Sequence, residues 1–454
     1  MKSVALHNLG CKVNSYEVDV MQQNLQENGF LIVPFDEIAD IYIVNTCTVT
    51  NIADQKSRKM LHRARQKNPD AIVVAVGCFV QTEEETLKDA SIERSMEKII
   101  DLAVGNNKKN ELVQILNEYI LNRRVDVDTV IDINRETEYE EMSLKQIRDH
   151  TRAFVKIQDG CNQFCSYCII PHVRGRVRSR AESAIIDEVN KLNNVEIVLT
   201  GINLSSYGSD FNDENALINL LEKLVKIPGL IRIRLGSLEP RLITAEFAEK
   251  MADMPKICPH FHLSLQSGCD ETLKRMNRHY NTAEYFEKTG ILRAAYRKKY
   301  GDDYEPALTT DVIVGFPGET EEEFLETENF IKKVDFFETH VFKYSKRKGT
   351  AAADMPNQIP AAVKKERSNR LIELSKIKAC EYRRRFIGRK VTVILEEIKV
   401  IKSEEYWLGY TGEYVRVGIS VKAFAEKLVG AGHVVMGVVT GFLDEITMGI
   451  EFFE

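Results

Sequence analysis

Short apolar runs alternate with amphipathic stretches over residues 1 to about 125. The runs have the length and the continuous apolar character of buried parallel strands, whereas the stretches between them carry apolar residues at the spacing of a helix. The predicted strands are Val4 to Leu6, Ile41 to Val44 and Ile72 to Val76, and the predicted helices are Ser15 to Asn28 and Ile52 to Lys67. This alternation predicts a doubly wound α/β sheet as the first domain.

The same rhythm of strand and helix resumes six times in the middle of the chain. An acidic, polar stretch at residues 136–141 falls within a predicted linker, residues 126–145, which precedes the middle domain, residues 146–378. The predicted strands there are Phe154 to Ile157, Ile197 to Thr200, Ile231 to Leu235, Phe261 to Leu265, Leu308 to Val314 and His340 to Tyr344, with helical patterns such as Ala181 to Leu192, Leu217 to Val225 and Glu321 to Lys333 between them. Six βα units predict a partial barrel, open on one side, with its chemistry at the C-terminal ends of the strands.

The end of the chain has a different pattern. A long helix, about Ala361 to Phe386, leads into short strands that are separated by glycine-containing turns. These predicted strands are Val391 to Leu395, Tyr406 to Tyr410, Val415 to Val417 and Val434 to Phe442. They predict a small β-barrel over residues 379–454, so that an α/β chain of about three domains results.

The amino-acid composition is that of a folded protein rather than a disordered or membrane-spanning one. Of the 454 residues, 44% are hydrophobic and 29% are charged, as in an ordinary folded protein. The longest nearly uninterrupted apolar run, Ala71 to Val80, is about half of a membrane span, and no signal peptide is expected. Nine cysteines, an odd number, argue against a disulfide framework, so we expect a reduced, cytoplasmic protein without membrane contact. The net charge of −6 leaves only local basic patches for binding nucleic acid.

Three cysteines close together form the most informative motif. Cys161, Cys165 and Cys168 follow the first predicted strand of the middle domain. Three thiolates can hold three irons of a four-iron cluster, and the fourth iron is then open to a substrate or cofactor. Two alternatives are ordinary buried cysteines and a zinc site with His172 as the fourth ligand.

A second set of cysteines occupies one repeated position in the first domain. Cys11, Cys47 and Cys78 each stand where a predicted strand ends. Because the C-terminal ends of neighbouring parallel strands meet at one edge of a sheet, we expect these three residues to converge. A buried cysteine is common on its own, but the repetition favours a second three-thiolate cluster.

With these motifs, the chain resembles the methylthiotransferase branch of the radical S-adenosylmethionine (SAM) enzymes over nearly its whole length. The spacing Cys161-x-x-x-Cys165-x-x-Cys168 matches the signature of that superfamily, and Cys11, Cys47 and Cys78 match the cysteines of the branch's N-terminal domain. The final β-barrel resembles the RNA-binding TRAM domain. The resemblance implies two [4Fe-4S] clusters, one for each set of cysteines, and two uses of S-adenosyl-L-methionine, as methyl donor and as radical source.

The residues around Cys11 indicate the substrate. The segment Leu9-Gly10-Cys11-Lys12-Val13-Asn14 is most similar to enzymes that act on N6-threonylcarbamoyladenosine in tRNA, and the segment from Arg234 to Pro240 supports the same subgroup. The resemblance assigns the SAM contacts to three strand ends. These contacts are Thr200 and Gly201 for the methionine amino group, Ser264 and Gln266 for the ribose, and Val314 and Gly315 for the adenine.

Two sets of cations are candidate contacts for substrate or RNA. One recurs at period two, so that an extended segment would place all its guanidinium groups on one face, and it comprises Arg174, Arg176, Arg178 and Arg180. The alternative for this set is a solvated surface. The other, the basic run before the β-barrel, comprises Arg383, Arg384, Arg385, Arg389 and Lys390, which are candidate phosphate contacts. Trp407 and Tyr410 are candidates for base stacking, although small β-barrels more often use aromatic residues as core.

Together these features predict a tRNA methylthiotransferase that converts N6-threonylcarbamoyladenosine beside the anticodon to its 2-methylthio form. No catalytic residue is expected beyond the cluster ligands, because a cofactor brings the radical chemistry. We expect a monomer whose partners are the anticodon stem-loop of tRNA and a reducing electron-donor protein. The alternatives are the same chemistry on isopentenyladenosine or on a ribosomal protein aspartate, and an iron–sulfur electron carrier with an RNA-binding tail.

Overall fold

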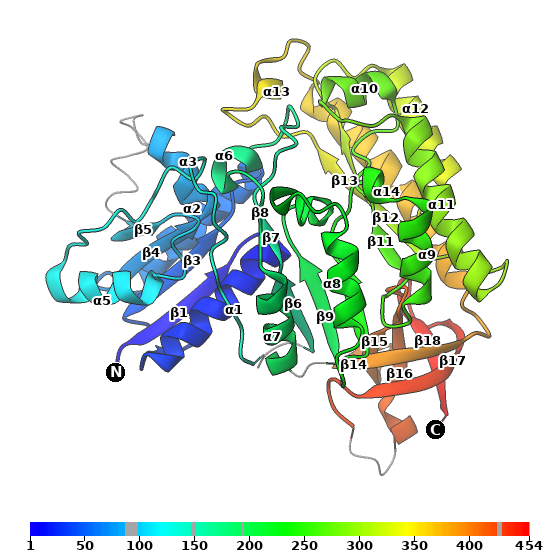
Figure 1. The fold of residues 1–454 in the computed structure, drawn as a ribbon, viewed down its shortest axis with the longest axis horizontal. Helices are drawn as coiled ribbons and strands as arrows, with labels where there is room; N and C mark the ends of the chain where they lie inside the picture. Colours follow the sequence, from blue (N-terminus) through cyan, green and yellow to red (C-terminus); the bar gives the residue numbers. More distant parts are fainter. Residues whose placement is uncertain (87–98, 147–150, 193–194, 425–428, 454) are drawn as a thin grey trace.

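The computed structural model describes residues 1–86, 99–146, 151–192, 195–424 and 429–453. Three parts follow one another along the chain in Figure 1: an N-terminal sheet in blue and cyan, a curved central sheet flanked by helices, and a red β-barrel at the C-terminus. Within the described residues, none of the helices combines the length and the apolar character that a membrane crossing requires.

The N-terminal sheet has five parallel strands in the order β2-β1-β3-β4-β5. β3 (Ile41–Thr46) and β4 (Ile72–Gly77) are buried at every residue, which accounts for their continuous apolar sequences. The other strands are β1 (Ser3–Asn8), β2 (Leu31–Ile32) and β5 (Leu102–Val104), and the helices are α1 (Lys12–Glu27), α2 (Asn51–Lys67), α3 (Cys78–Thr86) and α5 (Leu112–Asn122). α1 and α5 pack with one face of the sheet, and α2 packs with the other. The predicted doubly wound α/β sheet is therefore confirmed.

The central sheet has six strands that run parallel to one another. β6, β9 and β10 form one half and β11, β12 and β13 form the other, while parallel bridges from Ile233 to Ile257 and from Leu238 to Leu263 join the halves. The strands are β6 (Arg152–Lys156), β9 (Glu196–Thr200), β10 (Arg232–Leu235), β11 (His260–His262), β12 (Ala307–Val314) and β13 (Glu338–Lys343). Within the described residues β6 and β13 have no named strand on their outer sides, so the predicted partial six-unit barrel, open on one side, is confirmed.

Helices cover the outside of the central sheet (Figure 1). The long ones are α7 (Glu182–Leu192), α8 (Ala216–Leu224), α9 (Ala245–Asp253), α11 (Thr282–Tyr300), α12 (Glu321–Val334) and α14 (Ala361–Arg384). A short antiparallel pair, β7 (Gln158–Asp159) and β8 (Arg178–Ser179), and the short helices α6 (Ile170–Arg174) and α10 (Asp270–Arg275) lie in the connecting segments.

The C-terminal barrel closes in the order β14-β15-β16-β18-β17. Its strands are β14 (Lys390–Ile401), β15 (Glu404–Tyr410), β16 (Arg416–Ser420), β17 (Val434–Phe442) and β18 (Met448–Phe453). Gly409 allows two strands to approach, since a Cβ atom there would lie 2.2 Å from the Ile394 carbonyl oxygen. The predicted small β-barrel is confirmed, and β18, which the apolar pattern did not indicate, closes it by pairing parallel with β16.

The predicted linker, residues 126–145, packs against both neighbouring domains. Its residues Met142 and Leu144 are buried. The Tyr16 hydroxyl of α1 donates to the Met142 carbonyl at 2.5 Å, and the Leu144 amide donates to Glu188 of α7 at 3.0 Å. The described part of this segment contains no named helix or strand, and two buried apolar side chains beyond its acidic stretch hold it against the N-terminal and central domains.

Candidate active site

Cys11, Cys47 and Cys78, here called the N-terminal triplet, lie at one edge of the N-terminal sheet. Cys11 is the N-cap of α1, Cys47 directly follows β3, and Cys78 begins α3 immediately after β4. Burial, and then the Cys78 thiol, raise the pKa of Cys47 to about 11. Gly10 has a φ of +113°, and a Cβ atom there would lie 3.0 Å from Cys47 Cβ, so the loop before Cys11 reaches Cys47 only because residue 10 is glycine.

Cys161, Cys165 and Cys168, here called the core triplet, lie on the loop between β7 and α6. The Cys168 amide donates to the Cys165 carbonyl at 2.9 Å, which holds the loop in a tight turn. Burial raises the pKa of Cys161 to about 11 and that of Cys168 to about 12, and the Cys165 thiol acts in the same direction on both. Arg278 Nη1 lies 3.0 Å from Cys165 Sγ and supplies a positive charge beside these thiols.

The spacing of the thiols separates a four-iron site from a zinc site. The ligand atoms around a tetrahedral zinc ion lie about 4 Å apart. Within the described residues the one group of metal-ligand atoms that all lie within 4.8 Å of one another is His262, Asp311 and His340, so neither triplet has zinc spacing. His172 is exposed, with its ring 6.3 Å from that of Phe164. The three separated thiols of each triplet fit the larger four-iron group.

One short segment joins the two triplets. α6 directly follows Cys168, and Ile169 and Val173 pack against Cys78 in one buried cluster. Asn106 Nδ2 donates to the Val173 carbonyl at 2.6 Å and lies 3.6 Å from Cys78 Sγ. The core triplet and the N-terminal triplet are therefore held in a fixed relation to one another.

Arg174 lies at the centre of a buried ionic network between the two domains. Its guanidinium donates to Glu17 at 2.8 Å and to Asp159 at 3.0 Å, and Lys109 and Lys156 also contact Glu17. Burial alone would raise the pKa of Glu17, but Arg174, Lys109 and Lys156 outweigh it and hold that pKa well below its usual range. Arg174 is 1% exposed, so its guanidinium serves the protein interior.

The prediction of four ligand-facing arginines on one extended face is wrong for three of them. Arg174, Arg178 and Arg180 are buried, and Arg178 donates to backbone carbonyls while Arg180 pairs with Glu188 and Glu141. The segment is not extended, because Arg174 ends a helix and Gly175, with a φ of +70°, turns the chain. Arg176 alone of the four is exposed, with its guanidinium 4.5 Å from the centre of the Phe164 ring.

The predicted SAM contacts fall into two groups. Thr200 and Gly201 end β9, and a Cβ atom on Gly201 would lie 2.9 Å from Gln158 Oε1, so only a glycine leaves this strand end open. Ser264 and Gln266 follow β11, and the Ile313 amide donates to the Gln266 carbonyl at 2.9 Å, which brings them beside the end of β12. Val314 and Gly315 are buried there, and a Cβ atom on Gly315 would collide with the Lys364 side chain.

A large cavity of about 1020 Å³ lies where the three parts of the chain meet. Its walls include Cys11 and Lys12 from the N-terminal domain, Thr200 and Gly201 from the central sheet, and Tyr414 from the C-terminal barrel. The cavity also has polar side chains that the sequence prediction missed, namely Arg152, Arg234, His260, His262, Asp311 and His340. The sequence could have indicated some of these residues, because alternate residues of a strand face the same side. His260 and His262 are two positions apart, as are Thr309 and Asp311, and all four face the cavity.

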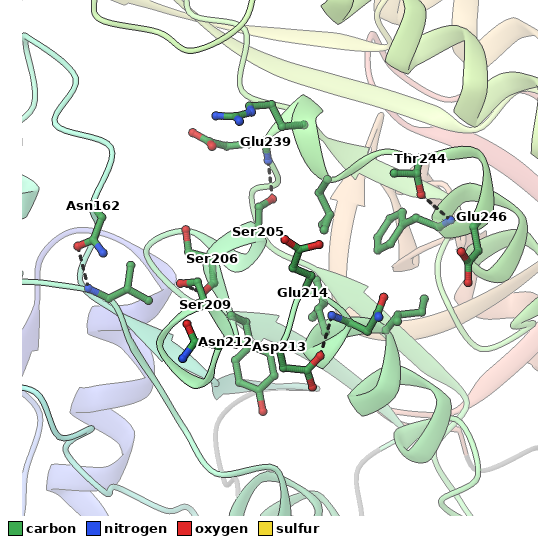
Figure 2. A pocket seen from close by; sticks show the side chains of 18 of the residues that line it. Asn162, Ser205, Ser206, Ser209, Asn212, Asp213, Glu214, Glu239, Thr244 and Glu246 are labelled. Carbon is green, nitrogen blue, oxygen red and sulfur yellow. Dashed lines mark hydrogen bonds between the residues drawn. The ribbon is translucent and has the colours of Figure 1, made fainter.

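A second, acidic cavity of about 810 Å³ opens beside the cysteine loop (Figure 2). Figure 2 shows the carboxylates of Glu214, Glu239 and Glu246 around it, together with Asn162 of the cysteine loop. Glu239 also pairs with Arg278 at 3.1 Å, and Arg278 contacts Cys165. The acidic cavity therefore belongs to the surroundings of the core triplet.

The basic run before the β-barrel is only partly free. Arg383 is buried against Glu338 at 2.5 Å, and Arg385 pairs with Asp335 at 2.8 Å. Arg389 donates to the Asp303 carbonyl at 3.1 Å, whereas Arg384 and Lys390 are exposed. Tyr410 packs against Tyr414 with ring centres 4.7 Å apart, and Trp407 packs in part against the barrel core.

A partial six-unit barrel that carries three thiols on the loop after its first strand defines a radical SAM enzyme. Comparisons with known proteins agree: residues 3–97 match the model of Uncharacterized protein family UPF0004, and residues 155–331 match that of the Radical SAM superfamily. The solved radical SAM methyltransferase TsrM from Kitasatospora setae, with cobalamin and a [4Fe-4S] cluster bound, has the same fold, with a TM-score of 0.56 and 18% identity over 78% of this chain and 77% of that one.

Curated relatives identify the family. The chain is 41% identical to the threonylcarbamoyladenosine tRNA methylthiotransferase MtaB of Bacillus subtilis, over 92% of this chain and 90% of that protein. It is 38% identical to the protein of the same name in Aquifex aeolicus, over 89% and 95%, and 37% identical to the tRNA-2-methylthio-N(6)-dimethylallyladenosine synthase of Caldicellulosiruptor saccharolyticus, over 85% and 80%. The chain belongs to the radical SAM methylthiotransferase family.

Proposed function

We propose that this enzyme attaches a methylthio group to N6-threonylcarbamoyladenosine beside the anticodon of tRNA. The observation that carries the proposal is the large cavity, because Cys11 and Thr200 line the same space from opposite domains. A nucleoside in this space would lie beside Cys11 of the N-terminal triplet and beside two of the proposed SAM contacts, Thr200 and Gly201. The relatives with the highest identity act on the threonylcarbamoyl nucleoside by name, which supports this substrate.

The residues of the two triplets fit two [4Fe-4S] clusters. The core triplet would hold one, with Arg278 beside it, and the N-terminal triplet would hold the other. The group at the core triplet, with S-adenosyl-L-methionine, supplies the radical chemistry that an aromatic C–H bond requires. Thr200, Gly201, Ser264, Gln266, Val314 and Gly315 remain our proposed contacts for that molecule, as methyl donor and as radical source.

The remaining residues would bind and orient the RNA. Arg384, Arg389 and Lys390 lie at the entrance to the C-terminal barrel without a carboxylate partner in the described part of the chain, so phosphates of the anticodon stem-loop are their proposed ligands. A separate protein would donate the reducing electron. We further propose that the enzyme acts as a monomer in the cytoplasm.

The sibling substrate, dimethylallyladenosine, is the second candidate, because relatives that make its 2-methylthio form are also similar to this chain. The polar walls of the large cavity argue against it. A wholly apolar prenyl group would leave the Lys12 ammonium desolvated and without a partner.

Nucleoside mass spectrometry tests the proposal. A host that lacks this gene should accumulate N6-threonylcarbamoyladenosine without its 2-methylthio form, and return of the gene should restore that form. If the returned gene instead restores 2-methylthio-dimethylallyladenosine, the substrate assignment is wrong.

A further inference from the structure

Lys12 faces the large cavity without a partner. It is the first residue of α1, next to Cys11, and its side chain is exposed to the cavity. Among the described residues, its ammonium has no ion pair and no hydrogen bond. The helix dipole places a partial positive charge at this same end of α1, so a cation there is unfavourable unless an anion binds.

Both arginines that line the large cavity are already paired, and so are three of its four carboxylates. Arg152 contacts Glu396 at 2.5 Å, and Arg234 contacts Glu196 at 2.6 Å. Glu338 pairs with Arg383 and Glu397 with Lys399, whereas Asp311 lies 3.3 Å from His262 Nε2, a contact that is an ion pair only when His262 is protonated. Asp311 also attracts Lys12 electrostatically but forms no ion pair with it. Within the described residues, Lys12 is therefore the one lysine or arginine of this cavity that is open to an anionic ligand.

We propose that the Lys12 ammonium binds the carboxylate of the threonylcarbamoyl group and thereby selects the substrate nucleoside. The inference rests on the proposed function and adds the residue that reads the modification. A compact ammonium on a flexible stem suits a single carboxylate, whereas Arg152 and Arg234 are already engaged by Glu396 and Glu196. Because Cys11 adjoins Lys12, this contact would hold the modified base beside the N-terminal triplet.

Lys12 could instead bind two other anions, an RNA phosphate or a negatively charged cluster held by Cys11. Two anticodon stem-loops separate these sources. One carries N6-threonylcarbamoyladenosine, and the other carries the corresponding threoninamide, which has the same shape but no negative charge. Affinity by fluorescence anisotropy and methylthiolation rate are measured with the reconstituted wild type, Lys12→Gln, Lys12→Arg, and Lys59→Gln, which removes an exposed lysine of α2 as a matched control.

The wild type should prefer the carboxylate RNA by about tenfold to a hundredfold, as expected for a hydrogen bond to a charged group. Lys12→Gln should lose this preference by weakening the carboxylate RNA alone, Lys12→Arg should keep part of it, and Lys59→Gln should behave as the wild type. Iron content and the cluster absorption spectrum should not change.

Three results would overturn the inference. Equal weakening of both RNAs by Lys12→Gln would mean that Lys12 binds a phosphate. A changed iron content with an unchanged preference would mean that Lys12 serves the cluster. A wild type that modifies neither RNA would contradict the proposed function itself, and this inference with it.

Discussion

Arg174 Nη2 donates to Asn14 Oδ1 at 2.6 Å, and this bond ties the helix that follows Cys168 to the helix that follows Cys11. Asn14 in turn donates from Nδ2 to the carbonyls of Leu9 and Thr46, which flank Cys11 and Cys47. This buried guanidinium therefore helps to fix the position of the N-terminal triplet relative to the core triplet, together with the packing of Ile169 and Val173 against Cys78. In the proposed function both triplets act on one bound nucleoside, so we regard Arg174 as a positioning residue.

Arg174→Met should lower the free energy of unfolding by about 3–5 kcal/mol, because it leaves buried carboxylates of Glu17 and Asp159 with fewer cations. Arg176→Met is the matched control, since its exposed guanidinium should matter by no more than about 0.5 kcal/mol. Urea denaturation measures the free energy of unfolding of both variants, read from the transition in which the N-terminal sheet unfolds. Equal effects of the two substitutions would contradict the buried network.

The same network predicts a dependence of stability on pH. The folded-state pKa of Glu17 is well below its usual range, so its contribution is fully present above the unfolded pKa of about 4.3 and is lost as pH falls below it. The melting temperature of the iron-free protein should fall from about pH 5 downward, and Glu17→Gln should reduce that fall while lowering stability at neutral pH. Identical acid limbs for the two proteins would show that Glu17 is not held in its charged form.

Gly10→Ala should impair assembly of the N-terminal iron site. The added methyl group would lie 3.0 Å from Cys47 Cβ, at a φ of +113° that alanine rarely adopts. The anaerobically reconstituted wild type should contain about eight irons and the variant closer to four. Gly29→Ala is the control, because Gly29 also has a positive φ of +82° but has no atom within 4 Å of an added Cβ. If both variants keep the full iron content, the convergence at Cys47 is not needed for iron binding.

Unpaired cations of the basic run should control the salt dependence of RNA binding. Replacing Arg384, Arg389 and Lys390 by Gln should flatten the slope of log affinity against log salt by about 2, at about 0.7 per lost phosphate contact. Arg383→Gln should leave the slope unchanged, because Glu338 already neutralises that guanidinium. An unchanged slope in the triple variant would place the RNA on another surface.

The features that could be predicted from the sequence are those that depend on residues close together in the chain. Apolar runs located the strands, and parallel strand ends explain why Cys11, Cys47 and Cys78 meet. It could not predict the burial of Arg174, because its partner Glu17 lies far away in the chain and nothing local shows that two domains enclose the pair. The sequence likewise could not show that Lys12 is a candidate binding residue. That Lys12 has no partner can be recognised only in the folded structure, where residues from three domains line the large cavity.

We propose that the two triplets perform different steps of one reaction: radical formation at the core triplet, and delivery of the methylthio group at the N-terminal triplet. The most direct test of this central claim is an anaerobic assay of the Cys11, Cys47 and Cys78 triple alanine variant with a threonylcarbamoyladenosine stem-loop, reductant and S-adenosyl-L-methionine, in which mass spectrometry follows 5′-deoxyadenosine and the methylthiolated nucleoside together. The account predicts continued formation of 5′-deoxyadenosine without methylthiolated RNA, and loss of both products in the Cys161, Cys165 and Cys168 variant. Methylthiolated RNA from the first variant would contradict it.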